Sequence, residues 1–371
     1  MHHVNVQATG FAYDVRVGTS LLPTLGRETK AAGRSPSTFL VTDARVAEHY
    51  LAPATESLRA AGLEAQAAVL PPGEATKTLA QAGDLFDRML RAGLDRGSVV
   101  VGLGGGVVTD LAGFAAAAYM RGVAWVAVST SLLGQVDASV GGKTGVDHPE
   151  CKNLIGAFHQ PSVVLADVGT LATLPEEELR TGLAEVVKHA MIRDATLMDR
   201  LEADADAILA RDPAVLEDVV ARNVRIKADV VSADEREGGL RRILNYGHTI
   251  GHAIESLAMA SGDAPGGEAM THGRAVALGM VAEAHIARAR GLLSADDADR
   301  QRRILARFGL PVALEAPLDA DRCLALARHD KKARAGRLWF ILPEAVGRVT
   351  QTDDVTDDEI CAALAHLADR A

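Results

Sequence analysis

The sequence predicts an α/β domain with a parallel, Rossmann-like sheet, followed by a mainly helical domain. Short β-branched runs alternate with helical segments up to about residue 175, which is the pattern of a sheet built from β-α-β units. Beyond that point long helical segments follow one another. A chain of 371 residues, 48% of them hydrophobic, is also too long for one compact domain of ordinary size. We therefore expect two domains, 1–175 and 176–371.

Five apolar runs in the first half predict buried strands. Each is short and rich in β-branched and other apolar residues, which suits the interior of a parallel sheet. The runs are 37–41, 66–70, 98–101, 124–128 and 162–165.

Four segments in the second half have the periodicity of amphipathic helices. The first follows Pro175 and opens on three glutamates, which is typical of a helix start. We expect no strands after this point, and a loop at 262–267, where glycine and proline gather. The helical segments are 176–193, 213–233, 243–258 and 272–290.

Composition excludes several classes of protein. A net charge of −10 argues against a general affinity for nucleic acid. The three cysteines, Cys151, Cys323 and Cys361, lack the spacing of a zinc knuckle or a disulfide framework, which indicates a reducing compartment. The sequence has no stretch apolar enough to span a bilayer, and its first residues do not read as a signal peptide. We expect a cytoplasmic protein that associates with no membrane.

Three histidines within 25 residues indicate a metal site. His248 and His252 are one helical turn apart, so their imidazoles point the same way, and His272 follows a loop. Imidazoles with one carboxylate form catalytic sites for divalent metals. Glu185 lies in an otherwise apolar helical turn, where burial requires a cation. Because Glu185 and His189 are also spaced i, i+4, spacing alone does not choose between the two pairs.

A glycine-rich turn at 102–110 leaves a predicted strand and enters a helix. Glycines there let backbone amides approach a phosphate at the positive end of the helix, as in dinucleotide sites. The usual third glycine of the fingerprint is replaced by Thr109. A tight turn without any ligand explains the same glycines equally well.

Lysines near a second glycine pair suggest an anion site. Gly142-Lys143-Thr144 is not a P-loop, because Asp137 and Ala138 stand where the earlier glycine is required. Lys143, with Lys152 and Asn153 further on, can instead bind a carboxylate or a phosphate. Solvated surface lysines are the alternative, and the same choice applies to the basic residues further along the chain, which are Lys227, Arg241, Arg242, Lys331 and Lys332.

In order along the chain, these blocks resemble the 3-dehydroquinate synthase family. The shared pattern includes Gly-Gly-Gly-Val before Asp110, Gln-Val-Asp ending at Asp137, Gly-Leu-Ala-Glu ending at Glu185, Gly-His-Thr-Ile-Gly-His ending at His252, and His-Gly beginning at His272. The resemblance runs from about residue 72 to 343. It implies an NAD-binding domain, a helical domain, an active site in the cleft between them, one divalent metal, usually zinc although cobalt also fits, and a homodimer.

The family converts a sugar phosphate, 3-deoxy-D-arabino-heptulosonate 7-phosphate, to 3-dehydroquinate and phosphate in the shikimate pathway. NAD is transiently reduced, phosphate is eliminated, and the ring closes as an aldol. By resemblance the metal ligands are Glu185, His248 and His272, whereas His252 contacts the substrate or transfers a proton, and His189 has no family role. The other residues that the resemblance assigns to catalysis and substrate are Arg121, from across the dimer, Asp137, Lys143, Asn153, Lys188, Lys227, Arg241, Asn245, and one of Lys331 and Lys332.

The resemblance also assigns residues to the cofactor. Asp110 and Asp137 are acceptors suited to sugar hydroxyls or to orienting a lysine. The predicted cofactor residues are Gly73, Glu74, Lys77, Gly105, Gly106, Val107, Val108, Thr109, Asp110, Thr130, Ser131, Lys143, Lys152, Thr170, Leu171 and Thr173.

Five positions depart from the family pattern. Pro72, Thr109, Ser129 and Ser131 lie on the cofactor side, where the family has aspartate, glycine, proline and threonine. Arg274 stands where the family commonly has glutamate. A cation two residues after a metal ligand weakens metal binding unless it meets a carboxylate such as Glu283 or points to solvent.

Three alternatives remain open on the sequence. A sedoheptulose 7-phosphate cyclase of the valiolone or gadusol type shares the fold, the metal and NAD, but Arg241, Asn245 and His252 keep the synthase pattern. A metal-dependent polyol dehydrogenase would produce net NADH from an alcohol. A catalytically silent scaffold protein would lack turnover, and the intact set of site residues argues against it.

Overall fold

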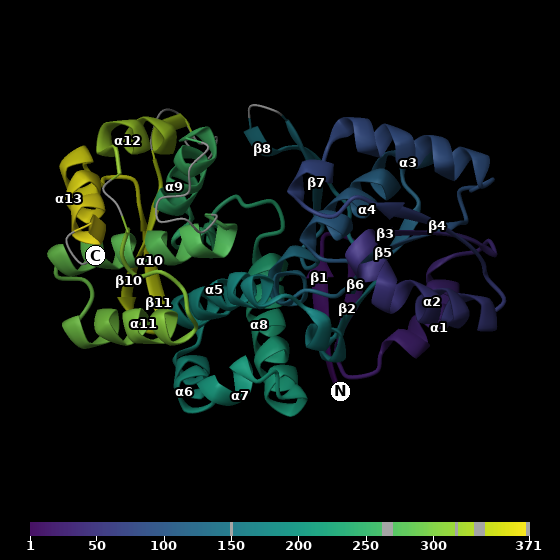
Figure 1. Cartoon of the computed structure of the whole chain (residues 1–371), viewed down its shortest axis with the longest axis horizontal. Helices are drawn as coiled ribbons and strands as arrows, with labels where there is room; N and C mark the ends of the chain where they lie inside the picture. Colours follow the sequence, from purple (N-terminus) through teal and green to yellow (C-terminus); the bar gives the residue numbers. More distant parts are fainter. Residues whose placement is uncertain (149–150, 262–269, 316–317, 330–337, 369–371) are drawn as a thin grey trace. The chain divides into compact units, whose positions relative to one another are not determined.

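The computed structural model divides the chain into two compact units. The first comprises 1–179 and 211–235, and the second comprises 180–210 and 236–371 (Figure 1). The structure describes residues 1–148, 151–261, 270–315, 318–329 and 338–368.

A seven-stranded sheet forms the centre of the first unit. Its strand order is β1-β2-β9-β6-β5-β3-β4, and every neighbouring pair is parallel except β1 and β2. All five predicted strands are confirmed, and the antiparallel hairpin at the N-terminal end was not predicted. The strands are β1 (His2–Ala8), β2 (Phe11–Gly18), β3 (Ser37–Asp43), β4 (Glu64–Leu70), β5 (Val99–Gly104), β6 (Ala124–Ser129) and β9 (Val163–Asp167).

Helices cover both faces of this sheet. Val101 and Leu103 of β5 belong to an apolar cluster that includes Leu25 and Leu58 of α1 and α2. The intervening residue is Gly102, and a Cβ built on it would point to the other face, 3.0 Å from the Cβ of Ala112 in α4. The two-residue alternation along one strand therefore serves two helical layers, and the predicted parallel α/β fold is confirmed. The helices are α1 (Leu25–Ala32), α2 (Ala44–Ala60), α3 (Leu79–Arg91) and α4 (Gly106–Ala118).

Smaller elements complete the first unit. β7 (Lys143–His148) and β8 (Cys151–Phe158) form a separate two-stranded ribbon, which the sequence did not predict. The short helical turns are η1 (Leu22–Thr24), η2 (Glu74–Thr76), η3 (Tyr119–Arg121), η4 (Gly134–Ala138) and η5 (Val168–Thr173).

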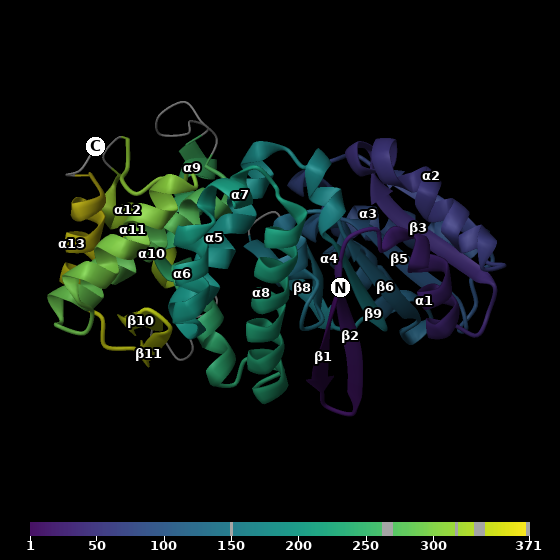
Figure 2. The same ribbon diagram turned by 90° about the horizontal axis from the view of Figure 1, so that it is seen from below.

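Helix α8 (Pro213–Ala233) has the bounds predicted for it but packs on the first unit, where it contacts β1, β2, η4 and η5 (Figure 2). An amphipathic pattern shows which face of a helix is buried and not what buries it. The compact units therefore do not coincide with the predicted domains 1–175 and 176–371. That division into domains stays a prediction.

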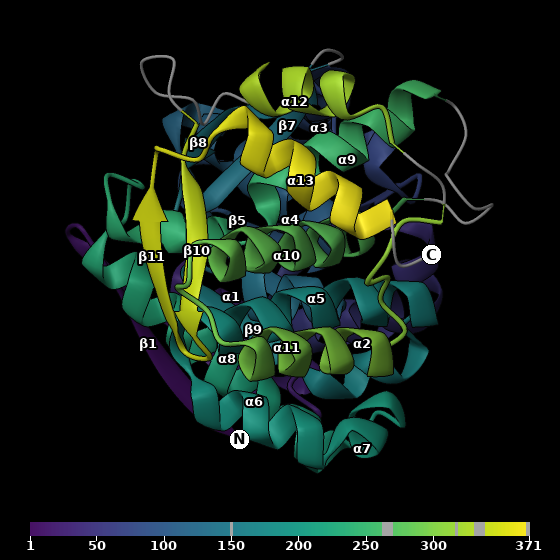
Figure 3. The same cartoon turned by 90° about the vertical axis from the view of Figure 1, so that its left-hand side faces the viewer.

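Helix α10 lies at the centre of the second unit. It is buried along most of its length and packs against α9, α11, α13 and β10 (Figure 3). The predicted helices are confirmed, except that 243–258 is split into a 3-10 turn, η6 (Leu240–Asn245), and a helix. The helices are α5 (Glu176–Arg193), which begins in the first unit, α6 (Ala195–Ala203), α7 (Ala205–Leu209), α9 (His248–Ser261), α10 (His272–Ala289), α11 (Ala295–Arg307), α12 (Ala320–His329) and α13 (Asp357–Ala368).

The expectation that strands stop after Pro175 is wrong for one hairpin. β10 (Phe340–Ala345) and β11 (Arg348–Thr352) pair antiparallel, and the first four residues of β10 are buried. The apolar run Trp339 to Leu342 has the composition of a strand. It was not predicted as one because the segments around it have the pattern of helices. The loop predicted at 262–267 lies outside the described residues.

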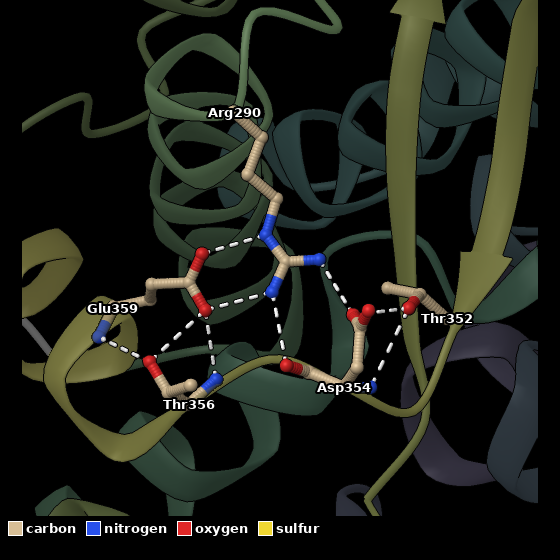
Figure 4. A network of polar contacts seen from close by, with 5 residues as sticks. All are labelled: Arg290, Thr352, Asp354, Thr356 and Glu359. Carbon is tan, nitrogen blue, oxygen red and sulfur yellow. Dashed lines mark hydrogen bonds and ion pairs between the residues drawn. The ribbon is translucent and has the colours of Figure 1, made fainter.

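An arginine at the end of α10 ties this hairpin to α13. The guanidinium of Arg290 donates to both carboxylate oxygens of Glu359, at 2.6 and 2.7 Å, and to Asp354 (Figure 4). Thr356 donates to the same carboxylate of Glu359. These bonds hold the pKa of Glu359 at about 2, well below its usual value, chiefly because of Arg290. Across the described part of the chain no helix is both long and apolar enough to cross a bilayer.

Candidate functional site

Three helices of the second unit bring one carboxylate and two imidazoles together. Glu185 lies in α5, His248 begins α9 and His272 begins α10. Nε2 of His248 is 3.6 Å and Nε2 of His272 is 3.5 Å from Oε1 of Glu185. One ligand atom from each residue lies within 4.8 Å of the others, so the group could hold a metal ion. One carboxylate oxygen and two imidazole nitrogens are a donor set suited to zinc.

Close backbone packing makes this convergence possible. A Cβ on Gly279 in α10 would lie 1.9 Å from the carbonyl oxygen of Gly247, which directly precedes α9. A Cβ on Gly273 would lie 2.4 Å from Cα of Thr181 in α5. These glycines let α10 approach both other helices at the level of the two histidines. Their positions beside metal-site residues in the sequence therefore have a packing cause.

Charged groups surround the three residues. Glu185 is fully buried and is in contact with the ammonium of Lys188, which is also buried. Burial lowers the pKa of His272, but the carboxylates of Glu185 and Glu255 outweigh burial and raise this pKa to about 9. In the absence of a metal the two carboxylates therefore favour a second proton on the imidazole of His272. A cation that binds here takes the place of that proton.

His252 lies beside this group. Its ring centroid is 5.1 Å from that of His248 and 5.9 Å from that of His272. A second possible set of metal ligands is formed by His252, Glu255 and His272. The spacing ambiguity of the sequence is reduced, because His248 faces Glu185 together with His272.

Glu255 was not among the predicted site residues. Its Oε2 lies 3.6 Å from Nδ1 of His272, and its side chain is almost fully buried. The sequence did contain a signal, because Glu255 follows His252 by three positions and His248 by seven, which places all three on one helical face.

The glycine turn of the first unit links β5 to α4. Gly104 is required by packing, because its Cβ would lie 2.6 Å from Cβ of Val108, whose own side chain is in the core. Gly105 precedes the helix without a side-chain cap. The first amides of a helix have no acceptor within the helix, so they are suited to a phosphate. Packing therefore accounts for Gly104, and phosphate binding at the start of α4 stays a prediction.

The departure at Thr109 is accommodated inside the helix. The side chain is buried, and its hydroxyl donates to the carbonyl oxygens of Gly105 and Gly106, at 3.2 and 3.1 Å. Ser129 and Ser131 are also buried, and Ser131 accepts a hydrogen bond from the amide of Gly134. These hydroxyls support the backbone around the turn.

Predicted cofactor and substrate residues meet at Lys77. Its ammonium lies 2.7 Å from Oδ2 of Asp110 and donates to Oδ1 of Asn153 at 2.6 Å. Burial lowers the pKa of Lys77, but the charges of Asp110 and Glu74 outweigh burial and leave this pKa above its usual value. Lys77 is therefore a charged, nearly buried cation at the edge of the glycine turn.

Asp137 and Lys227, which were predicted separately as site residues, are in contact in the first unit. The ammonium of Lys227 contacts both the carboxylate and the backbone carbonyl of Asp137. Because α8 packs on η4, a lysine that is 90 positions away in the sequence reaches this aspartate. Lys143 begins β7, where it is exposed.

Arg121 is presented by a strained turn. Met120, Arg121 and Gly122 have φ values of 49°, 68° and 115°, in a region that residues with side chains rarely adopt. The side chain of Arg121 is exposed. Backbone strain held by surrounding structure is a frequent feature of binding sites.

The other predicted residues have varied environments. Leu171 is fully buried in the core, which limits any cofactor contact to its backbone. Thr170 and Thr173 both bond to the hydroxyl of Tyr50.

In the second unit Asn245 donates to Glu237 at 2.8 Å, and Arg241 is buried. Lys331 and Lys332 lie outside the described residues. Thr130 is buried, Gly73 adopts a positive φ, and Glu74, Pro72 and Lys152 are exposed.

Arg274 lies near a carboxylate. Its guanidinium is 3.9 Å from Oε1 of Glu315. Glu283 accepts a hydrogen bond from the amide of Gly247 at 2.8 Å. Two positions along a helix turn a side chain away from His272, so the cation of Arg274 and the imidazole lie on different faces of α10.

Comparisons with known proteins assign a family. A family model described as 3-dehydroquinate synthase N-terminal matches residues 67–181, and one described as 3-dehydroquinate synthase C-terminal matches residues 182–333. The chain belongs to the 3-dehydroquinate synthase family. The resemblance seen in the sequence motifs is thereby confirmed. A curated relative from Symbiobacterium thermophilum, named 3-dehydroquinate synthase, is 49% identical and covers 96% of this chain and 98% of its own.

Solved structures of two synthases with other names share the fold. ValA, a 2-epi-5-epi-valiolone synthase from Streptomyces hygroscopicus subsp. jinggangensis 5008 with NAD+ and Zn2+ bound, is 32% identical with a TM-score of 0.88 and covers 97% of this chain and 98% of its own. A 2-deoxy-scyllo-inosose synthase complexed with carbaglucose-6-phosphate, NAD+ and Co2+ is 25% identical with a TM-score of 0.86 and covers 98% and 99%.

Proposed function

We propose that this family member is a lyase that converts 3-deoxy-D-arabino-heptulosonate 7-phosphate to 3-dehydroquinate and phosphate. The convergence of Glu185, His248 and His272 on one point carries the proposal, because the family assignment alone leaves open whether the catalytic centre is intact. Relatives named 3-dehydroquinate synthase match nearly the whole chain and support this reaction.

The residues present fit a divalent metal. Two imidazole nitrogens face a buried carboxylate oxygen, which is the donor chemistry of zinc and also suits cobalt. The cyclases of similar structure contain NAD+ with Zn2+ or Co2+, which supports both cofactors for this chain. When bound, the metal supplies a Lewis acid that acidifies a substrate hydroxyl, and NAD accepts a hydride and returns it, so that NAD is recycled.

The chain's own residues bind and orient the substrate. The substrate carries both a carboxylate and a phosphate, so several cations are needed to hold it through the reaction, and charge-assisted hydrogen bonds are the strongest means of doing so. His252, beside the proposed metal ligands, is positioned to move a proton of the substrate. We assign substrate contacts to Arg121, Asp137, Lys143, Asn153, Lys188, Lys227, Arg241, Asn245 and one of Lys331 and Lys332.

The first unit supplies the nucleotide site in this proposal. The amides at the start of α4 bind the pyrophosphate, and Asp110 binds a ribose hydroxyl or orients Lys77. The buried hydroxyl of Thr109 is turned toward carbonyl groups of its own helix, so this departure from the family pattern is compatible with NAD binding.

Phosphate release from two substrates tests the reaction. The purified protein is supplied with NAD, zinc and either 3-deoxy-D-arabino-heptulosonate 7-phosphate or sedoheptulose 7-phosphate. We expect release from the first substrate alone and no net NADH. Release only from the second would identify a cyclase of the valiolone or gadusol type, which the greater identity to 3-dehydroquinate synthases does not favour. Net NADH from an alcohol would identify a polyol dehydrogenase.

Two variants test the residue assignments. Glu185→Ala should lose the metal and turnover together, because it removes a ligand. His252→Ala should keep the metal and lose rate. Equal metal loss in both variants, measured by metal content after dialysis, would show that the histidine pair has been assigned wrongly.

We also propose that the protein is a cytoplasmic homodimer in which Arg121 contacts phosphate bound to the partner. The support is the family resemblance and the exposed, strained turn at Arg121. Sedimentation analysis tests the dimer, and mixing inactive Arg121→Ala subunits with inactive Glu185→Ala subunits tests the shared site, because mixed dimers should regain part of the activity.

A further inference from the structure

The ring of His272 lies between two carboxylates. Nε2 is 3.5 Å from Oε1 of Glu185, and Nδ1 is 3.6 Å from Oε2 of Glu255. The two nitrogens are on opposite sides of the imidazole, so the two acids approach from different directions. Glu255 comes from α9, which packs along α10, and its side chain is almost fully buried.

His248 has the same arrangement with a different acceptor. Its Nε2 faces Glu185 at 3.6 Å, and its Nδ1 lies 3.1 Å from the carbonyl oxygen of Tyr246. A carbonyl oxygen can only accept, so the proton of His248 belongs on Nδ1 and the lone pair on Nε2. An ionised carboxylate also only accepts, and Glu255 therefore favours the same tautomer in His272.

The distance defines what Glu255 contributes. At 3.6 Å its carboxylate is within range of an ion pair and beyond a hydrogen bond of normal length. Its effect is therefore electrostatic attraction of a proton on Nδ1, so that Nε2, on the side of Glu185, is the nitrogen left to bind a metal. A carboxylate behind a ligating histidine orients the ring and makes it more basic.

We propose that Glu255 is a positioning residue that holds His272 with Nε2 available to the metal. The inference rests on the proposed function, since it takes Glu185, His248 and His272 as the ligands. Glu255 touches neither metal nor substrate in this role. Residues that support metal ligands in this way typically change metal affinity by about 10- to 100-fold when removed.

A second cation is the competing interpretation. His252, Glu255 and His272 could themselves ligate a metal. Both sets use His272, and a metal on each nitrogen would require the imidazole to lose its remaining proton, which is unfavourable near neutral pH. Positioning by Glu255 therefore predicts one metal ion per chain, whereas a second site predicts two.

Metal titration of three variants tests the inference without measuring turnover. Zinc and cobalt(II) affinities are measured against a competing chelator for Glu255→Ala, Glu255→Gln and Glu359→Gln. We expect Glu255→Ala to bind zinc about 10- to 100-fold more weakly and to have an altered cobalt absorption spectrum. Glu255→Gln should be weakened less, because its amide oxygen keeps a partial negative charge on the side of Nδ1 although the full charge is lost. Glu359→Gln is the matched control in the same unit, and should lose stability and keep wild-type metal affinity.

Several results would overturn the inference. These are wild-type zinc affinity and cobalt spectrum in Glu255→Ala, two metal ions per wild-type chain with one lost in Glu255→Ala, or equal weakening in Glu359→Gln. If Glu255→Ala does not fold, wild-type zinc affinity in Glu255→Gln would also overturn the inference. Failure of the proposed function is distinguishable, because it would appear as absent phosphate release or as metal retained by Glu185→Ala.

Discussion

Gly279→Ala should separate α9 from α10 and weaken both folding and metal binding. The new Cβ would lie 1.9 Å from the carbonyl oxygen of Gly247 and 2.8 Å from the amide nitrogen of Gly251. Carbon and oxygen atoms in contact without a covalent bond lie at least about 3.3 Å apart. The backbones at Gly279 and Gly247 must therefore move apart by about 1.4 Å. Because the obstacle is backbone and not the end of a flexible side chain, no rotamer change relieves it.

Overpacking of this kind costs about 2–3 kcal/mol. The displaced segment directly precedes His248, so we expect zinc affinity to fall by about tenfold or more, as when support for a ligand is lost. The assay is urea unfolding of the metal-free protein followed by circular dichroism, with zinc affinity measured separately. Transition midpoints are compared, since a chain of two compact units need not unfold in one step.

Gly83→Ala is the matched control. Gly83 lies within α3, and a Cβ there would meet no atom within 4 Å. Alanine should stabilise this helix by up to about 1 kcal/mol and leave zinc affinity unchanged. A Gly279→Ala protein with the midpoint and zinc affinity of the wild type would refute the claim that close helix packing sets the distance between the two histidines.

Three further predictions concern charges. The contribution of Glu359 to stability is present above its usual pKa of 4.5 and is lost as the pH falls through about 2. Wild type should therefore be more stable than Glu359→Gln above pH 4.5, and this difference in the free energy of unfolding should shrink as the pH falls toward 2. We expect a decrease of about 1–2 kcal/mol, after allowance for solvent screening of the pair with Arg290, measured by urea unfolding at each pH. Asp110→Asn and Lys77→Met should each weaken NAD binding about tenfold, measured by fluorescence titration, and a loss of zinc affinity in either would contradict the assignment to the nucleotide site. Asp43→Ala should cost about 1 kcal/mol, because Asp43 caps α2 through two backbone amides, and an unchanged unfolding midpoint would contradict this.

The sequence predicted elements whose pattern is local. The central strands β3, β5 and β6 are continuous apolar runs, and α8 and α10 have clear periodicity, so their positions could be read directly. It did not predict the ribbon of β7 and β8, whose alternating polar and glycine-rich residues indicated an anion site more than a strand.

Partners in space were harder to predict than elements. Spacing left two pairs open, Glu185 with His189 and His248 with His252, and it could not show the contacts across helices that bring Glu185 near His248 and His272. That pairing depends on how closely α9 and α10 approach, which is a property of tertiary packing. Glu255 was missed for the same reason, since its relation to His272 crosses between two helices.

The return of residues 211–235 to the first unit has a consequence for synthesis on the ribosome. Strands β1 and β2 are made first, yet α8, which packs on them, emerges only after 31 residues of the second unit, 180–210, have been made. The surface of β1 and β2 that α8 covers therefore stays exposed on the nascent chain until synthesis has reached residue 235. A polypeptide truncated at residue 179 would leave this apolar face open to solvent and prone to association, so neither unit can be obtained by a single cut.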